Sequence, residues 1–177
     1  MGFEIDWMQK KKFKGEKVTL NYLKQNKDGF FMSKLIIYFS LTGNNRRFAK
    51  ELAKKENLDI LEFTHGGSLR VVFHFMFKGR LARKAKKIDI SNYDEIIIFG
   101  PIWGDKPAPA VSALLENLEI AGKNIECHIS HTMDKIDVAE EIIKNTIAER
   151  NGTLKKLDFT LVAEKTTWFS SFLFFFT

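Results

Sequence analysis

The chain has 177 residues, of which 45% are hydrophobic and 28% are charged, and it contains one cysteine. This length and composition are typical of a single globular domain and exclude a disordered or fibrous protein. A single cysteine excludes an intrachain disulfide and any multi-cysteine zinc or iron–sulfur site, which favours a reducing cytoplasm. The net charge of +6 would suit nucleic acid, an anionic membrane or an acidic protein. It requires none of these partners.

The two ends of the chain differ in composition from the part between them. Residues 1–31 carry seven lysines and have no apolar stretch of the kind a secretory signal needs, so we predict a mobile N-terminal extension rather than an export signal. Residues 163–177 form an aromatic tail that is too short for a membrane span of about 20 residues. The tail is predicted to pack on the domain, to join a partner or to aggregate, and these alternatives stay open.

Strand and helix patterns alternate through the predicted domain, residues 32–162. Continuous apolar runs predict strands, and apolar residues at helical spacing predict helices. The strands are expected at 35–39, 58–63, 95–99, 124–129 and 156–162, and the helices at 45–55, 108–118 and 138–149, with a partly helical basic segment at 69–85. This alternation predicts a doubly wound α/β fold with five parallel strands, whose ligand site lies at the carboxyl ends of the strands.

The basic segment contains a run of five cations that raises the question of nucleic-acid binding. The run consists of Arg80, Arg83, Lys84, Lys86 and Lys87. Nucleic-acid binding is better supported where aromatic residues alternate with basic ones on one surface. We therefore interpret this run as a solvated helix face and predict no nucleic-acid partner.

The loop after the first strand, residues 40–45, reads Ser-Leu-Thr-Gly-Asn-Asn and stands directly before a helix. Hydroxyl groups, a glycine and the backbone N–H groups of a helix N-terminus can hold a phosphate without a metal. A P-loop does not fit, because no Lys-Ser or Lys-Thr follows the glycine, and the three-glycine dinucleotide fingerprint is absent. The alternative interpretation is an ordinary turn in which Ser40 or Asn44 caps the helix.

This loop resembles the phosphate loop of the flavodoxin family, Ser/Thr-x-Thr-Gly-Asn-Thr, at five of six positions, and Asn45 is the departure. Residues 93–104 also resemble the family's third strand and flavin loop, and residues 107–109 continue the similarity. The resemblance covers about residues 32–162. It implies a flavodoxin-like fold in three α/β/α layers with strand order 2-1-3-4-5, and non-covalently bound FMN as the cofactor.

The resemblance also implies roles for two of the loops. Hydroxyl, amide and backbone donors would hold the FMN phosphate, and these residues are Ser40, Thr42, Gly43, Asn44 and Asn45. An indole would lie against the isoalloxazine while nearby backbone groups reach the ring edge, and this loop consists of Pro101, Ile102, Trp103 and Gly104. The interpretation of Trp103 as a core or interface aromatic stays open.

A third loop is similar to the family only loosely. It reads Ser130-His131-Thr132, without the family's small, glycine-containing sequence. The hydroxyl and imidazole groups of this loop are predicted to touch the pyrimidine end of the flavin.

Other reactive residue types do not form a recognisable site. Metal-ligand spacing is absent among the four histidines, so no metal site is predicted; these are His65, His74, His128 and His131. Cys127 lies in a predicted buried strand and is interpreted as a small core residue rather than a nucleophile. No catalytic side chain is predicted, because the flavin itself supplies the redox chemistry.

Three functions follow from the resemblance. The first is a flavodoxin-type carrier that passes electrons between protein partners, and the second is an FMN-dependent oxidoreductase that reduces a quinone or another small acceptor from NAD(P)H. No nicotinamide-binding motif is present, which favours the carrier. The third is a cofactor-free interaction module, which Asn45, the unusual third loop and the tail favour. Family carriers are typically acidic, so a redox partner of this basic chain should be differently charged. Dimerisation stays open.

Overall fold

The computed structural model describes residues 32–63, 78–132 and 136–162. The predicted N-terminal extension, the aromatic tail and the first part of the basic segment lie outside the described residues, as do His65 and His74.

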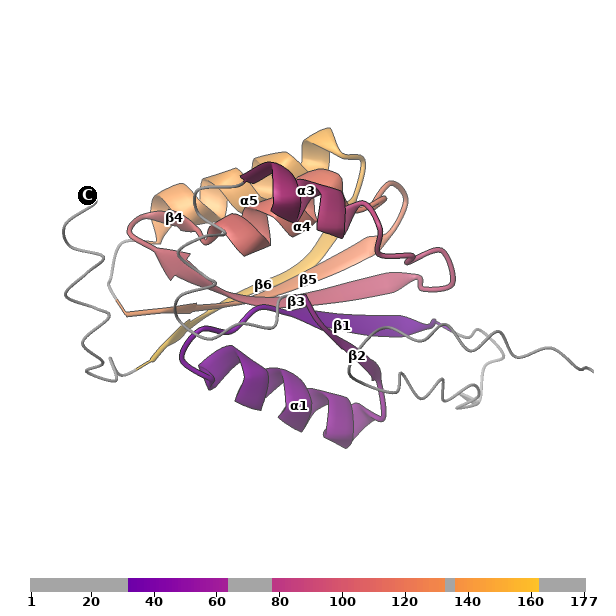
Figure 1. The fold of residues 1–177 in the computed structure, drawn as a ribbon, viewed down its shortest axis with the longest axis horizontal. Coiled ribbons are helices and arrows are strands. Elements are labelled where there is room, and N and C mark those ends of the chain that lie inside the picture. Colours follow the sequence, from indigo (N-terminus) through magenta and orange to yellow (C-terminus); the bar gives the residue numbers. More distant parts are fainter. Residues whose placement is uncertain (1–31, 64–77, 133–135, 163–177) are drawn as a thin grey trace, which may run out of the picture.

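A parallel sheet with strand order β2-β1-β3-β5-β6 forms the centre of the fold (Figure 1). Its strands are β1 (Lys34–Tyr38), β2 (Asp59–Glu62), β3 (Glu95–Trp103), β5 (Asn124–His131) and β6 (Thr153–Leu161). The two-residue β4 (Lys106–Pro107) pairs antiparallel with the end of β3. Without β4, this is the predicted order 2-1-3-4-5. The chain first moves from the central β1 to one edge and then crosses back to build the other.

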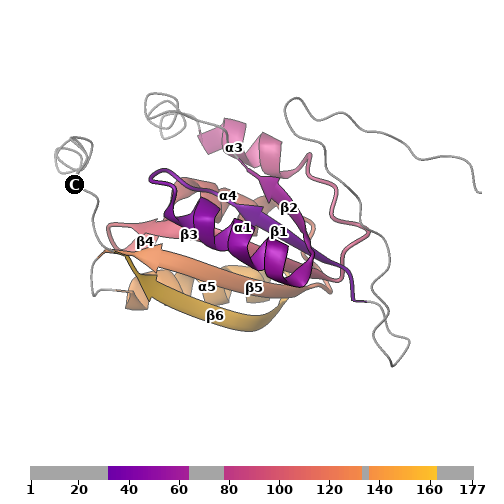
Figure 2. The ribbon, with the colours of Figure 1, turned by 90° about the horizontal axis from the view of Figure 1, so that it is seen from below.

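The helices lie on both faces of the sheet and complete three layers (Figures 1 and 2). On one face lies α1 (Asn44–Glu56), and on the other lie α3 (Lys78–Ala85), α4 (Pro109–Asn117) and α5 (Asp137–Glu149). Two asparagines with positive φ follow helices, Asn57 after α1 and Asn151 shortly after α5. Asparagine tolerates this left-handed conformation better than most residues, so both helices end at these points. The predicted α/β fold class is confirmed.

The central strands are buried on both faces, as their continuous apolar runs predicted. Ile36 and Ile97 pack under α1, whereas Ile37 and Ile98 pack on the opposite side, and all four are at most 1% exposed. The two strands at one side of the sheet are different. On β5, Ile125, Cys127 and Ile129 join the core below α4 and α5, but the alternate residues are polar. This half of the sheet is therefore apolar on one face only.

Three predicted boundaries were wrong. Residues 100–103 belong to β3 rather than to a loop, residues 130–131 belong to β5, and β6 begins at Thr153 instead of residue 156. In each case pairing with a neighbouring strand extends the element past its apolar run. The end of β5 pairs with β6, for example, where Ser130 stands beside Thr160. Such pairing joins segments that are distant in the sequence, so a local pattern does not reveal it.

Cys127 is fully buried, which confirms its interpretation as a core residue. Burial raises the pKa of the Cys127 thiol from 9.0 to about 12. Because the pKa is higher in the folded state, the stability due to the neutral thiol is present below pH 9 and is lost as the pH rises towards 12. We expect the unfolding equilibrium constant to rise by about tenfold for each pH unit in that range.

The control for this alkaline effect is Cys127→Ala, measured by urea unfolding between pH 8 and about pH 11. The variant should be less stable at pH 8 because a small cavity forms, but its stability should stay level up to about pH 10. Above that value a fall should remain, because burial also raises the pKa of Tyr38 to about 12. Equal slopes for the variant and the parent between pH 9 and 10 would contradict the prediction.

Candidate functional site

The carboxyl ends of β1, β3 and β5 meet at one edge of the sheet. Tyr38, Phe99 and His128 stand side by side in the strand register, and the backbone N–H of Phe39 donates to the carbonyl of Phe99 at 2.9 Å. The segments that follow these strands include the three predicted binding loops. The parallel register thus brings together residues that lie far apart in the sequence.

The first loop leads into α1 through Gly43, whose φ of 94° is in the region that favours glycine. The backbone N–H of Gly43 donates to the Ser40 hydroxyl at 3.1 Å, so Ser40 closes the loop rather than capping the helix. The N-cap residue is Gly43, which has no side chain to make a capping hydrogen bond, and the first turn of α1 contains no acidic residue. The N-terminus of this helix is therefore available to an anion.

Two arginines that the sequence analysis did not single out lie in the first turn of α1. Arg46 forms an ion pair with Glu62 at 2.6 Å, and hydrogen bonding to this carboxylate raises the pKa of the guanidinium. Arg47 is exposed and lies 3.7 Å from Glu51. Cations are unfavourable at the positive end of a helix dipole, and a bound anion would relieve this. The pair of arginines directly after the loop was the signal available in the sequence.

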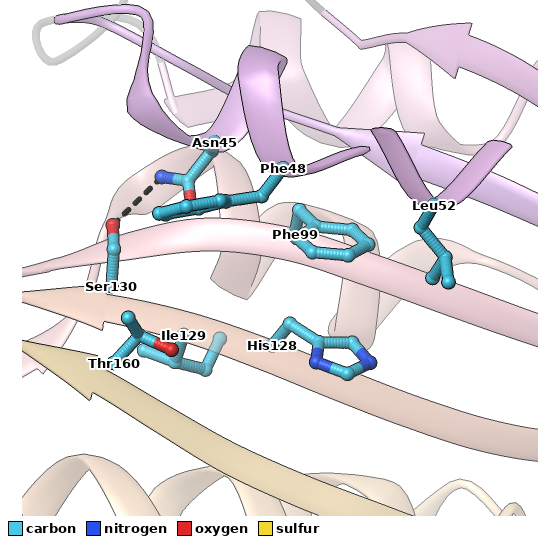
Figure 3. Close-up of a pocket in the computed structure, with 8 residues that line it drawn as sticks. All are labelled: Asn45, Phe48, Leu52, Phe99, His128, Ile129, Ser130 and Thr160. Carbon is cyan, nitrogen blue, oxygen red and sulfur yellow. Dashed lines mark hydrogen bonds between the residues drawn. The ribbon is translucent and has the colours of Figure 1, made fainter. Parts of the chain in front are cut away.

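Asn45 joins the first predicted loop to the third. The Asn45 amide donates through Nδ2 to the Ser130 hydroxyl at 2.8 Å, and both residues are buried (Figure 3). The side chain at the position where the sequence departs from the phosphate-loop pattern therefore connects α1 with the end of β5. Its other polar atom, Oδ1, is also buried and has no hydrogen-bond partner among the described residues.

Trp103 stands at the turn between β3 and β4. The ring of Trp103 meets the ring of Phe39 edge to face, with centroids 5.6 Å apart, so the indole lies next to the start of the first loop. Gly104 follows with a positive φ of 64° and allows the tight turn. The Ile102 side chain belongs to the core, and the Pro101 carbonyl accepts a hydrogen bond from the Ala108 N–H. At Ile102 only the backbone remains for a ligand.

The remaining predicted residues occupy different positions along this edge. Asn44 is half-buried at the start of α1, while Thr42 and Thr132 are exposed. The ring of His131 packs edge to face against Phe159, within the core layer below α5. Since Ser130 faces α1, these two neighbours on β5 point to opposite sides of the sheet. The structure thus brings together the first loop, Trp103 and Ser130 more closely than it does His131.

No protein-family model matches the chain, and no curated protein matches it either. Several solved structures do match the chain. A flavoprotein in complex with FMN from Lactobacillus acidophilus is 14% identical with a TM-score of 0.54, and the match covers 73% of this chain and 93% of that one. Oxidised flavodoxin 2 from Bacillus cereus is 20% identical with a TM-score of 0.50, covering 81% and 94%. Two-electron reduced Megasphaera elsdenii flavodoxin is 15% identical with a TM-score of 0.51, covering 76% and 90%.

The chain has a flavodoxin-like fold. At the edge of this flavodoxin-like domain, the arrangement provides an uncapped helix N-terminus for an anion and, beside it, an indole for a flat ring. Among the residues that the structure describes, no helix is long and apolar enough to cross a membrane. The same residues contain no group of three or more potential metal ligands.

Proposed function

We propose that this flavodoxin-like domain binds FMN without a covalent bond and carries electrons between redox partners. The observation that carries the proposal is the start of α1, where a positive-φ glycine precedes a helix with no side-chain cap and no acidic first turn. Phosphate is the anion that such a turn suits best, because several backbone N–H groups point towards it. The FMN complex of the Lactobacillus acidophilus flavoprotein, which has the same fold, supports the choice of FMN.

The proposed roles follow from the position of each residue. The phosphate would lie over Gly43 against the backbone N–H of Asn44, with the hydroxyls of Ser40 and Thr42 beside it; the Gly43 N–H itself donates to Ser40. Trp103 would cover one side of the flavin ring and exclude water there. Ser130, Thr132 and the backbone from Pro101 to Gly104 would line the rest of the ring. Asn45 and His131 would act from farther away, since their side chains pack on Ser130 and Phe159.

In this proposal the protein and its cofactor have separate roles, as in an electron carrier. FMN, when bound, supplies the redox chemistry. The protein binds and orients the ring and sets the polarity around it, so no side chain has to transfer a proton or form a covalent bond. The basic charge of the chain favours an acidic redox partner.

The test is a titration of the purified protein with FMN, followed by absorption and by quenching of flavin fluorescence. We expect saturable 1:1 binding, weakened about tenfold or more in Trp103→Ala because a stacking surface is lost. Trp103→Phe is the conservative control and should retain most of the affinity. Circular dichroism of both variants shows whether they are folded. Folded parent protein that binds no flavin would overturn the proposal and favour a cofactor-free interaction module.

A second measurement separates a carrier from an enzyme. FMN-loaded protein is reduced chemically and mixed with an electron-accepting protein such as cytochrome c, and in parallel it is supplied with NAD(P)H and a quinone. A carrier should reduce the protein acceptor in a single turnover and should consume no NAD(P)H. Continuous NAD(P)H oxidation that depends on the quinone would instead assign the domain to the oxidoreductases.

A further inference from the structure

A groove of about 240 Å³ lies on the face of the sheet that α1 only partly covers (Figure 3). One wall is α1, and the floor is formed by β3, β5 and β6. Its lining residues are Asn45, Phe48, Leu52, Phe99, His128, Ile129, Ser130 and Thr160. In both ribbon views the described helices leave this side of β5 and β6 open (Figures 1 and 2).

The part of the groove near α1 and β3 is aromatic and apolar, whereas polar side chains of Ser130 and Thr160 line it on β5 and β6. The rings of Phe99 and His128 stack with centroids 4.6 Å apart and an angle of 12° between their planes. Phe48 and Leu52 project towards them from α1 (Figure 3). An apolar surface of this kind is stabilised when another apolar group covers it and removes it from water.

Two buried polar atoms of the groove lining have no hydrogen-bond partner among the described residues, Oδ1 of Asn45 and Nε2 of His128. Asn45 is only 4% exposed, and its Oδ1 accepts no hydrogen bond from any described residue. A buried carbonyl oxygen without a hydrogen-bond partner destabilises the folded state. A group that fills the groove would therefore be stabilised further if it carried an N–H or O–H donor at this end.

An ion pair and two carboxylate–imidazole contacts lie at the border of the groove. Asp158 lies 2.6 Å from the Lys156 ammonium and 3.3 Å from Nδ1 of His128, and Glu126 lies 3.5 Å from Nε2 of the same imidazole. Because the Lys156–Asp158 pair is neutral overall, it does not favour a strongly charged occupant. The groove suits an uncharged, aromatic segment.

Such a segment follows β6 in the same chain. After Lys165 the sequence carries no charge, and it contains six aromatic residues between Trp168 and Phe176. The chain leaves β6 beside the groove, because Thr160 lines the groove and the Val162 N–H donates to the His131 carbonyl at 2.8 Å. The six residues that follow Val162, up to Trp168, can extend about 20 Å, whereas β3 lies only about 10 Å from β6.

We propose that residues 163–177 of this chain cover the groove on the α1 face of the sheet. The aromatic side chains fill the space over Phe99 and His128, and Trp168 is the one aromatic residue of the segment that carries an N–H donor for Asn45 Oδ1. This inference does not depend on flavin binding. It selects the first of the three alternatives that the composition of the tail left open.

The test measures how fast a cysteine in the groove reacts with a thiol reagent in the full chain, without flavin. Leu52→Cys places the thiol in the groove, whereas Lys50→Cys places it on the exposed face of α1 as the matched control. The native thiol of Cys127 is buried and should not react with the reagent. We expect Leu52→Cys to react about tenfold more slowly than Lys50→Cys, because the covered groove opens only transiently.

The decisive comparison adds Trp168→Ser and Phe172→Ser to each cysteine variant. The protection of Leu52→Cys should then disappear, while Lys50→Cys should react as before. Thr160→Cys, at the other end of the groove, repeats the measurement if Leu52→Cys does not fold. Equal reactivity with and without the aromatic residues would overturn the proposal. Protection that grows with protein concentration, together with a dimer in sedimentation, would overturn it in favour of a second copy of the chain.

Discussion

Gly100→Ala should lower the free energy of unfolding by about 3 kcal/mol. A Cβ at Gly100 would stand 2.2 Å from Cγ2 of Val111, whose side chain is completely buried on α4. That distance is much shorter than any real contact between non-bonded carbon atoms, so α4 would have to move away from β3. The movement would loosen the core below α4 at the point where β3 leads towards Trp103. Urea unfolding followed by circular dichroism measures the loss.

Two controls show whether the contact with Val111 is the cause. Gly104→Ala replaces a second glycine, in the turn after β3, but nothing lies within 4 Å of the new Cβ, so only backbone strain of about 1 kcal/mol is expected. In the double variant Gly100→Ala/Val111→Ala the methyl groups that clash are gone. The double variant should lose less stability than the sum of the two single ones. A Gly100→Ala variant no less stable than Gly104→Ala would contradict this explanation.

FMN should bind about 100-fold more tightly than riboflavin, which lacks the phosphate. Two hydrogen bonds from backbone N–H groups to a charged phosphate contribute about 3 kcal/mol together, which corresponds to that ratio. The start of α1 is the part of the site expected to make these bonds, because it has no side-chain cap and no acidic first turn. Fluorescence titrations with both ligands under the same buffer conditions give the ratio.

Ser40→Ala assigns the phosphate preference to the first loop. The Ser40 hydroxyl accepts a hydrogen bond from the Gly43 N–H, so the variant should loosen the loop and weaken FMN binding about tenfold. Riboflavin binding should stay the same, since riboflavin has no phosphate to place there. A parent protein that binds both ligands equally would show that this loop is not a phosphate site. An equal loss for both ligands in Ser40→Ala would mean that the hydroxyl only supports the fold.

Much of the fold could be predicted because its signals are local. The apolar runs of β1 and β3 indicate strands buried on both faces, and the apolar spacing of α5 indicates a helix that ends near Asn151. The order of strands and helices then leaves few topologies open, because parallel crossovers are right-handed. The position of the first loop directly before α1 was likewise visible, as was the composition that suits a phosphate.

The details of the candidate site depended on contacts between distant segments. Asn45 and Ser130 are 85 positions apart, and their hydrogen bond exists only because α1 lies across the end of β5. The turn at Trp103 was expected to be a loop, because glycine and proline mark it in the sequence, but pairing with β4 makes it a hairpin. Neither contact leaves a periodic pattern in the residues around it.

By itself the sequence determined the alternation of strands and helices, the buried central strands and the loop before α1, because apolar spacing and turn residues act over a few neighbouring positions. Only the tertiary structure decided that the Asn45 amide donates a hydrogen bond to Ser130 and that His131 faces the core. It also decided that the described helices leave one side of β5 and β6 open. These features depend on strand register and on which helix covers which face. Both arise only when segments far apart in the chain pack together.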